Sequence, residues 1–214
     1  MWPSLPAISS AAAVVAAGLI TQAFFTFGPL SHHMAAHIVL MNAAAPLMAA
    51  GLVRAGFSRD APPWTIWTAA ALQMLTLWGW HAPLAQRAML DSAILQLVMH
   101  ATLFATALWF WSGLLRIAAS ARWQAIGALL LTGKLACLLG GLLIFAPRVV
   151  YGDASLHLHA SIPPMDDQQL AGLLMVTACP LSYVVAGVVF AAQWMTELER
   201  ASSIIRMPKQ IVVP

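Results

Sequence analysis

Charged residues are scarce in this sequence. Only 8% of the 214 residues are Asp, Glu, Lys or Arg, whereas 61% are hydrophobic. A soluble globular domain carries about 25% charged residues, because its surface must be hydrated. The deficit excludes a soluble protein and indicates that most of the surface faces lipid.

Cysteine and clustered positive charge are also scarce. Cys137 and Cys179 are the only cysteines, each in an apolar segment without a CxxC or CxC companion. We therefore expect packed residues rather than metal ligands or a disulfide. The net charge of +3 includes no run of Lys or Arg, which argues against nucleic-acid partners. The sequence also lacks a nucleophile–base pair, a phosphate loop and an H-E-x-x-H motif, so we do not expect an enzyme.

Long apolar runs, in contrast, are abundant. An apolar stretch of about 20 residues crosses a bilayer as a helix, and about six such stretches account for nearly the whole chain. The predicted fold class is all-α: a polytopic transmembrane helical bundle of about six spans, forming one integral membrane domain over residues 1–214. The expected spans cover residues 9–27, 31–53, 64–80, 92–115, 123–145 and 168–194, with an outer loop at 149–167 and a cytoplasmic tail at 195–214.

The distribution of Lys and Arg predicts the orientation of these spans. The side of both termini holds Arg54, Arg59, Arg116, Arg122, Arg200, Arg206 and Lys209, and the other side holds only Arg87 and Arg148. The positive-inside rule then places both termini in the cytoplasm, as in a multi-pass protein of a bacterial plasma (inner) membrane. Lys134 lies within the fifth span and has no obvious partner at its depth.

The histidines gather in the outer half of the predicted bundle. Ionisable groups at membrane depth are costly, so each is a candidate for function. The seven are His32, His33, His37, His81, His100, His157 and His159. His33 and His37 are four residues apart and share one helix face, and Met34 and Met41 lie nearby. Imidazole with thioether suits copper, particularly Cu(I); the competing interpretation is a pair of interfacial histidines that only hydrogen-bond.

Other polar residues at this face have two interpretations each. His100 lies about 13 Å inside the fourth span, where it is either functional or bonded to a neighbouring carbonyl. His81 follows tryptophans that also fit an interfacial belt. The His157-x-His159 pair is either solvated or a metal-capture arm. Asp167 either caps the last span or faces the histidines, as an orienting partner or a hard ligand.

Four blocks of sequence carry a family resemblance. In order they are His33-Met34-x-x-His37 with Pro46-Leu47 and Gly51; Trp80-His81-x-Pro83; His100 with Trp109-Phe110-Trp111; and Asp167-Gln168-Gln169-Leu170-Ala171-Gly172 with Met175. Together they resemble the CtaG-type cytochrome c oxidase assembly family, the multi-span family associated with caa3-type oxidases. The resemblance covers roughly residues 31–175. It implies a membrane assembly factor for haem–copper oxidase that acts in copper supply or insertion, and it carries over His33, His37, His81, His100 and Asp167.

The leading hypothesis is a non-enzymatic factor that holds copper transiently at the outer face. The four histidines would converge there, with Met34 or Met41 as soft donors and Asp167 orienting an imidazole. The copper would pass to an oxidase subunit or another copper carrier. Two alternatives stay open: a b-type cytochrome with bis-histidine haem, and a copper transporter, for which Cys137, Met74 and Lys134 hint at an inward path.

Overall fold

The computed structural model describes residues 28–56, 62–90, 92–151 and 162–206, and within these ranges every regular element is a helix. Four helical segments are long and apolar enough to cross a membrane: Pro29–Arg54, Ala93–Leu115, Ala119–Phe145 and Pro164–Ser203. The predicted third span corresponds to α4 (Thr65–Trp80), whose 16 residues are about 24 Å long. The predicted first span lies outside the described residues. The all-α prediction is confirmed, and the helices agree with about six spans.

The second span contains one irregular turn. It comprises α2 (Pro29–Val39), the π-helical turn η1 (Leu40–Ala44) and α3 (Ala45–Arg54). Pro46 has no N–H to donate, and the Ala45 N–H bonds to the Leu40 carbonyl five residues back. The Met41 carbonyl instead accepts a hydrogen bond from Trp111 Nε1 at 3.0 Å. The π turn thus ties the middle of this span to α6 (Ala93–Leu115).

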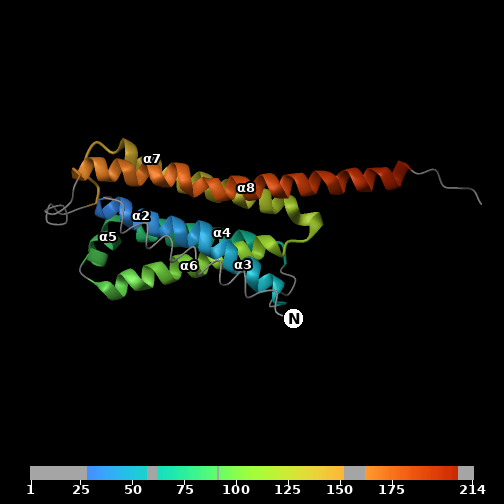
Figure 1. Ribbon diagram of the computed structural model, residues 1–214, viewed down its shortest axis with the longest axis horizontal. Coiled ribbons are helices and arrows are strands. Elements are labelled where there is room, and N and C mark those ends of the chain that lie inside the picture. Colours follow the sequence, from blue (N-terminus) through green and yellow to red (C-terminus); the bar gives the residue numbers. More distant parts are fainter. Residues whose placement is uncertain (1–27, 57–61, 91, 152–161, 207–214) are drawn as a thin grey trace, which may run out of the picture.

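The helices form two groups. Helices α7 (Arg122–Phe145) and α8 (Pro164–Arg206) pair along one side of a group made of α2, α3, α4, α6 and the short α5 (Pro83–Leu90) (Figure 1). Gly140 and Gly172 allow α7 and α8 to approach closely, because a Cβ at Gly172 would lie 2.7 Å from the Gly140 carbonyl oxygen. Small residues at such a crossing are typical of packing between membrane helices.

Helix α8 is longer than the predicted last span at both ends. Its 43 residues extend for about 65 Å and project beyond the other helices (Figure 1). Pro164 is suited to the first position of a helix, so the helix begins within the predicted loop at 149–167. The predicted tail is helical as far as Arg206, and its remainder lies outside the described residues.

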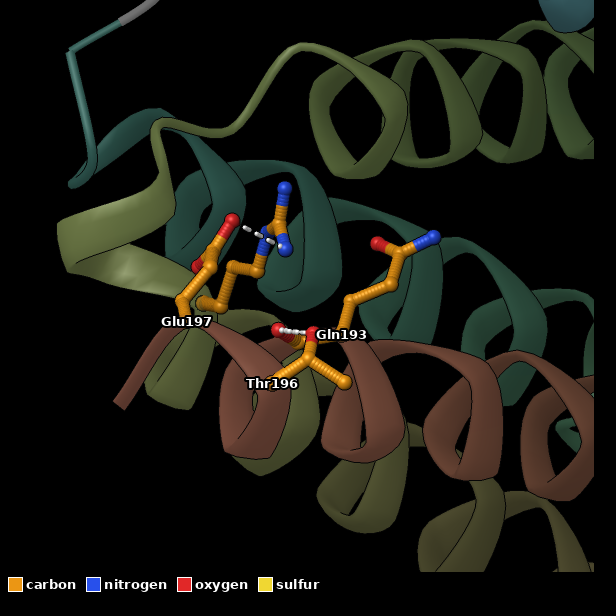
Figure 2. Close-up of polar contacts among 4 residues, drawn as sticks. Gln193, Thr196 and Glu197 are labelled. Atoms are coloured by element: carbon orange, nitrogen blue, oxygen red, sulfur yellow. Dashed lines mark hydrogen bonds and ion pairs between the residues drawn. The ribbon is translucent and has the colours of Figure 1, made fainter. Parts of the chain in front are cut away.

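Polar contacts mark the end of the bundle at which α7 begins. Arg122, at the start of α7, forms an ion pair of 2.7 Å with Glu197, near the end of α8, and Figure 2 shows this contact. Partly exposed pairs of this kind contribute about 1 kcal/mol or less. Lys134, half-way along α7, is exposed and has no hydrogen-bond or ion-pair partner among the described residues.

Candidate metal centre

Three helices bring four imidazoles together at the opposite end of the bundle. His33 and His37 come from α2, His81 follows the last residue of α4, and His100 lies in the first half of α6. The ring centroids of five pairs lie between 4.2 and 6.4 Å apart, and the shortest separation is between His33 and His37. His37 and His81 are buried, whereas His33 and His100 are partly exposed. We call these four residues the histidine cluster.

Hydrogen bonds set the tautomers of two cluster members. His81 Nδ1 lies 2.7 Å from the Leu77 carbonyl oxygen, and His100 Nδ1 lies 2.7 Å from the Gln96 carbonyl oxygen. A carbonyl can only accept, so each Nδ1 carries the proton and each neutral ring keeps a lone pair on Nε2. Metal-binding histidines are commonly oriented in this way, with one ring nitrogen bonded to a carbonyl and the other left for the ion.

The other two members contact each other. His37 Nε2 and His33 Nε2 lie 2.9 Å apart, so one ring donates to the other. His37 is only 4% exposed, and its Nδ1 has no hydrogen-bond partner in the part of the chain that the structure describes. Burying an unpaired polar atom costs about 1–3 kcal/mol. Such an atom calls for an explanation, and a bound ligand is one.

Two methionines border the cluster, as the sequence predicts. Met34 is buried, and its sulfur lies 3.3 Å from His81 Nε2. Met41 is buried one turn beyond His37 and lines a small cavity that continues inward from the cluster. We call this space the inner cavity; its lining includes Met34, His37, Met41, His81, Met175 and Cys179.

The imidazoles of the cluster lie close together and do not form a preformed metal site. Within the described ranges, no three His, Cys, Asp or Glu side chains are already arranged to hold a metal. The His33–His37 hydrogen bond occupies a nitrogen that an ion would need, and the Met34 sulfur lies against His81 Nε2. Binding therefore requires these rings to rotate apart.

Asp167 holds the start of α2. Its carboxylate is fully buried and accepts hydrogen bonds at 2.9 Å from the backbone N–H groups of Leu30 and Ser31, and another from the Ser31 hydroxyl. Gly28 permits this approach, because a Cβ there would lie 2.1 Å from the Asp167 Cγ. Of the two predicted roles, the structure shows the cap, although on α2 rather than on the last span. Among the described residues, Asp167 has no hydrogen bond to an imidazole.

Two further residues support this end of the bundle, and the sequence analysis assigned them no role. Gln168 is buried, accepts from the Val150 N–H at 2.6 Å and donates to the Leu143 carbonyl at 3.2 Å, which ties α8 to the end of α7. The Tyr151 hydroxyl donates to the His81 carbonyl. Burial raises the pKa of Tyr151 to about 12, so the hydroxyl keeps its proton at neutral pH. The other candidate pair, His157 and His159, lies outside the described residues.

Comparison with known proteins identifies the family of this chain. The model of the cytochrome c oxidase caa3 assembly factor family (Caa3_CtaG) matches residues 2–197. No curated protein and no solved structure matches the chain. The match spans most of the sequence and includes all four histidines of the cluster, as well as Asp167. The chain belongs to the cytochrome c oxidase caa3 assembly factor family.

Proposed function

We propose that this assembly factor binds copper at the histidine cluster and delivers it to cytochrome c oxidase or to another copper carrier. One observation carries the proposal. Four imidazoles gather at one end of the bundle with ring centroids 4.2 to 6.4 Å apart in five pairs, and the buried His37 Nδ1 lacks a partner among the described residues. Four neighbouring imidazoles can share a cation.

The donor set favours copper. His81 and His100 each keep an unprotonated Nε2 in the neutral state, and Met34 places a thioether beside His81. Imidazole suits several transition metals, whereas thioether selects Cu(I). Asp167 acts through backbone hydrogen bonds at the start of α2, so its contribution is to position His33 and His37.

The packing of the cluster supports transient binding. An ion must break the His33–His37 hydrogen bond, which re-forms when the ion leaves, and must separate the Met34 sulfur from His81 Nε2. Part of the binding energy therefore goes into rearrangement, which lowers affinity and favours exchange. A role in transfer rather than catalysis follows, with the protein as a non-enzymatic carrier.

We place the cluster at the outer face of a bacterial plasma membrane, with both termini in the cytoplasm. The support is the excess of Lys and Arg on the side of the termini. Copper held there is exposed to the compartment outside the membrane through the partly exposed His33 and His100.

The haem alternative requires a different geometry. A bis-histidine haem needs its macrocycle between two imidazoles, and the 2.9 Å contact between His33 and His37 leaves no room for a macrocycle between these two rings. A visible spectrum of the purified protein tests this directly: a Soret band with sharp alpha peaks would contradict the copper proposal.

The proposal can be tested in cells that lack the native protein and express variants in its place. We expect His33→Ala and His100→Ala to lower the copper content of the isolated oxidase several-fold. His32→Ala is the matched control, because it removes an exposed imidazole that is adjacent in sequence but is not a member of the cluster. Fully metallated oxidase with both cluster variants would contradict the proposal.

A further inference from the structure

We propose that the inner cavity is a second, sulfur-rich site that holds a monovalent soft cation, Cu(I), below the histidine cluster. The proposal rests on the proposed copper function and extends it to a site with a different donor set. The cavity has room for about one water-sized sphere, which matches a single ion.

Four sulfur atoms belong to residues that line this cavity. Met34 and Met41 reach it from the second span, and Met175 and Cys179 reach it from α8. All four residues are at most 6% exposed. Thiolate and thioether are soft ligands that suit Cu(I). Scattered core methionines fill gaps, but here three methionines and a cysteine surround one space.

His37 belongs to the lining of this cavity as well as to the histidine cluster. It is 4% exposed, and its Nδ1 has no partner among the described residues. His37 therefore connects the two sites, because its Nε2 contacts His33 in the cluster.

Cys179 has one hydrogen-bond donor beside its sulfur. The Asn42 amide donates to Cys179 Sγ at 3.4 Å, and Ser182 donates to the Asn42 carbonyl oxygen at 3.0 Å, which fixes the amide orientation. Asn42 lies in the π turn η1. Binding exchanges the Cys179 proton for Cu(I), and the proton leaves to solvent. The bound ion and the thiolate cancel in charge, so the site gains no net buried charge.

The two sites share residues. Met34, His37 and His81 line the inner cavity and also belong to the cluster or contact it. An ion can therefore pass between the imidazole-rich and the sulfur-rich sets without crossing lipid. The histidines would accept copper at the outer surface, and the sulfur set would retain it as Cu(I).

Ag(I) is a redox-silent probe for the sulfur set, used with the purified full-length protein under anaerobic conditions. We expect Cys179→Ser and Met175→Leu each to lower Ag(I) affinity at least tenfold, and X-ray absorption to show fewer sulfur neighbours around the ion. The matched controls are Cys137→Ser and Met99→Leu, which change residues outside the cavity lining. Leu closely matches Met in volume, so Met175→Leu preserves the fold, and a thermal melt verifies this.

The outcomes separate the two proposals. Unchanged Ag(I) affinity in Cys179→Ser and Met175→Leu, or Ag(I) bound by nitrogen alone, would overturn the second site even if histidine substitutions abolish copper delivery. Sulfur-bound Ag(I) in the His33→Ala, His100→Ala double variant supports the second site. If copper delivery by that double variant were normal, the proposed function would fail while the sulfur site remained.

Discussion

Asp167 caps α2, and one substitution can show whether this residue positions the start of α2 or binds copper directly. In Asp167→Asn, the side chain keeps one acceptor oxygen and loses its negative charge. The native carboxylate accepts two backbone hydrogen bonds at 2.9 Å and one from the Ser31 hydroxyl; both bonds from Ser31 are buried, and the bond from Leu30 is partly buried. Hydrogen bonds to charged groups contribute about 1.5–3 kcal/mol each. Because Asn preserves part of this set, we expect a loss of about 2–3 kcal/mol in unfolding free energy.

Equilibrium unfolding in mixed detergent micelles measures this loss, and metal analysis of the same samples measures copper. The start of α2 carries His33 and His37, so we expect weaker copper binding but an unchanged number of copper ions at saturation. Gly28→Ala is the matched variant, because its Cβ would displace the same carboxylate without altering any candidate ligand. We expect it to reproduce both effects.

The reasoning fails if Asp167→Asn unfolds like the native protein but no longer binds copper at saturation. That result would make Asp167 a ligand. An unchanged unfolding free energy in Gly28→Ala would also contradict the prediction, because the close approach of Gly28 to the carboxylate would then have no energetic consequence.

Three further substitutions test the packing of the bundle. Gly172→Ala should cost about 1–3 kcal/mol in unfolding free energy, since the added Cβ would lie 2.7 Å from the Gly140 carbonyl oxygen; a neutral result would contradict the close crossing. Tyr183→Phe should cost about 1–2 kcal/mol, because it removes the 2.8 Å bond to Gln73, whose Oε1 is already buried without a partner among the described residues. Lys134→Leu should raise the unfolding free energy of the isolated protein by up to about 3 kcal/mol, the cost of lysine at mid-membrane. A destabilised Lys134→Leu would show instead that this exposed lysine has a favourable contact.

The sequence predicted the histidine cluster because the signal is local. The spacing of four places His33 and His37 on one face, and the order of the spans places His81 and His100 at the same membrane side. Helical periodicity alone does not reveal that α2, α4 and α6 are neighbours. The ring separations of 5.1 to 6.4 Å between residues of different helices depend on that packing.

The role of Asp167 could not be predicted to the same extent. Its position in the sequence suggested a cap for the helix that contains it, but its partners lie 136 and 137 residues away. Gly28, beside Pro29, lies between the predicted first and second spans. In the structure, its missing side chain also makes room for the carboxylate. Contacts of this kind depend on tertiary packing and leave no periodic signal.

The end of α8 lies beyond the end of the predicted last span. The predicted span ended at 194 because charged residues begin soon afterwards, at Glu197. Charge ends a membrane-spanning segment, but it does not end a helix, since Glu, Arg and Ala are good helix formers. The helix therefore continues to Arg206.

The central claim is that the histidine cluster binds copper, and the copper content of the purified protein tests it most directly. After loading and removal of loosely bound metal with a weak chelator, the wild type and His32→Ala should retain equal amounts of copper. His33→Ala and His100→Ala should each retain several-fold less, because each removes one imidazole from the cluster. Unchanged copper content in both variants would contradict the claim.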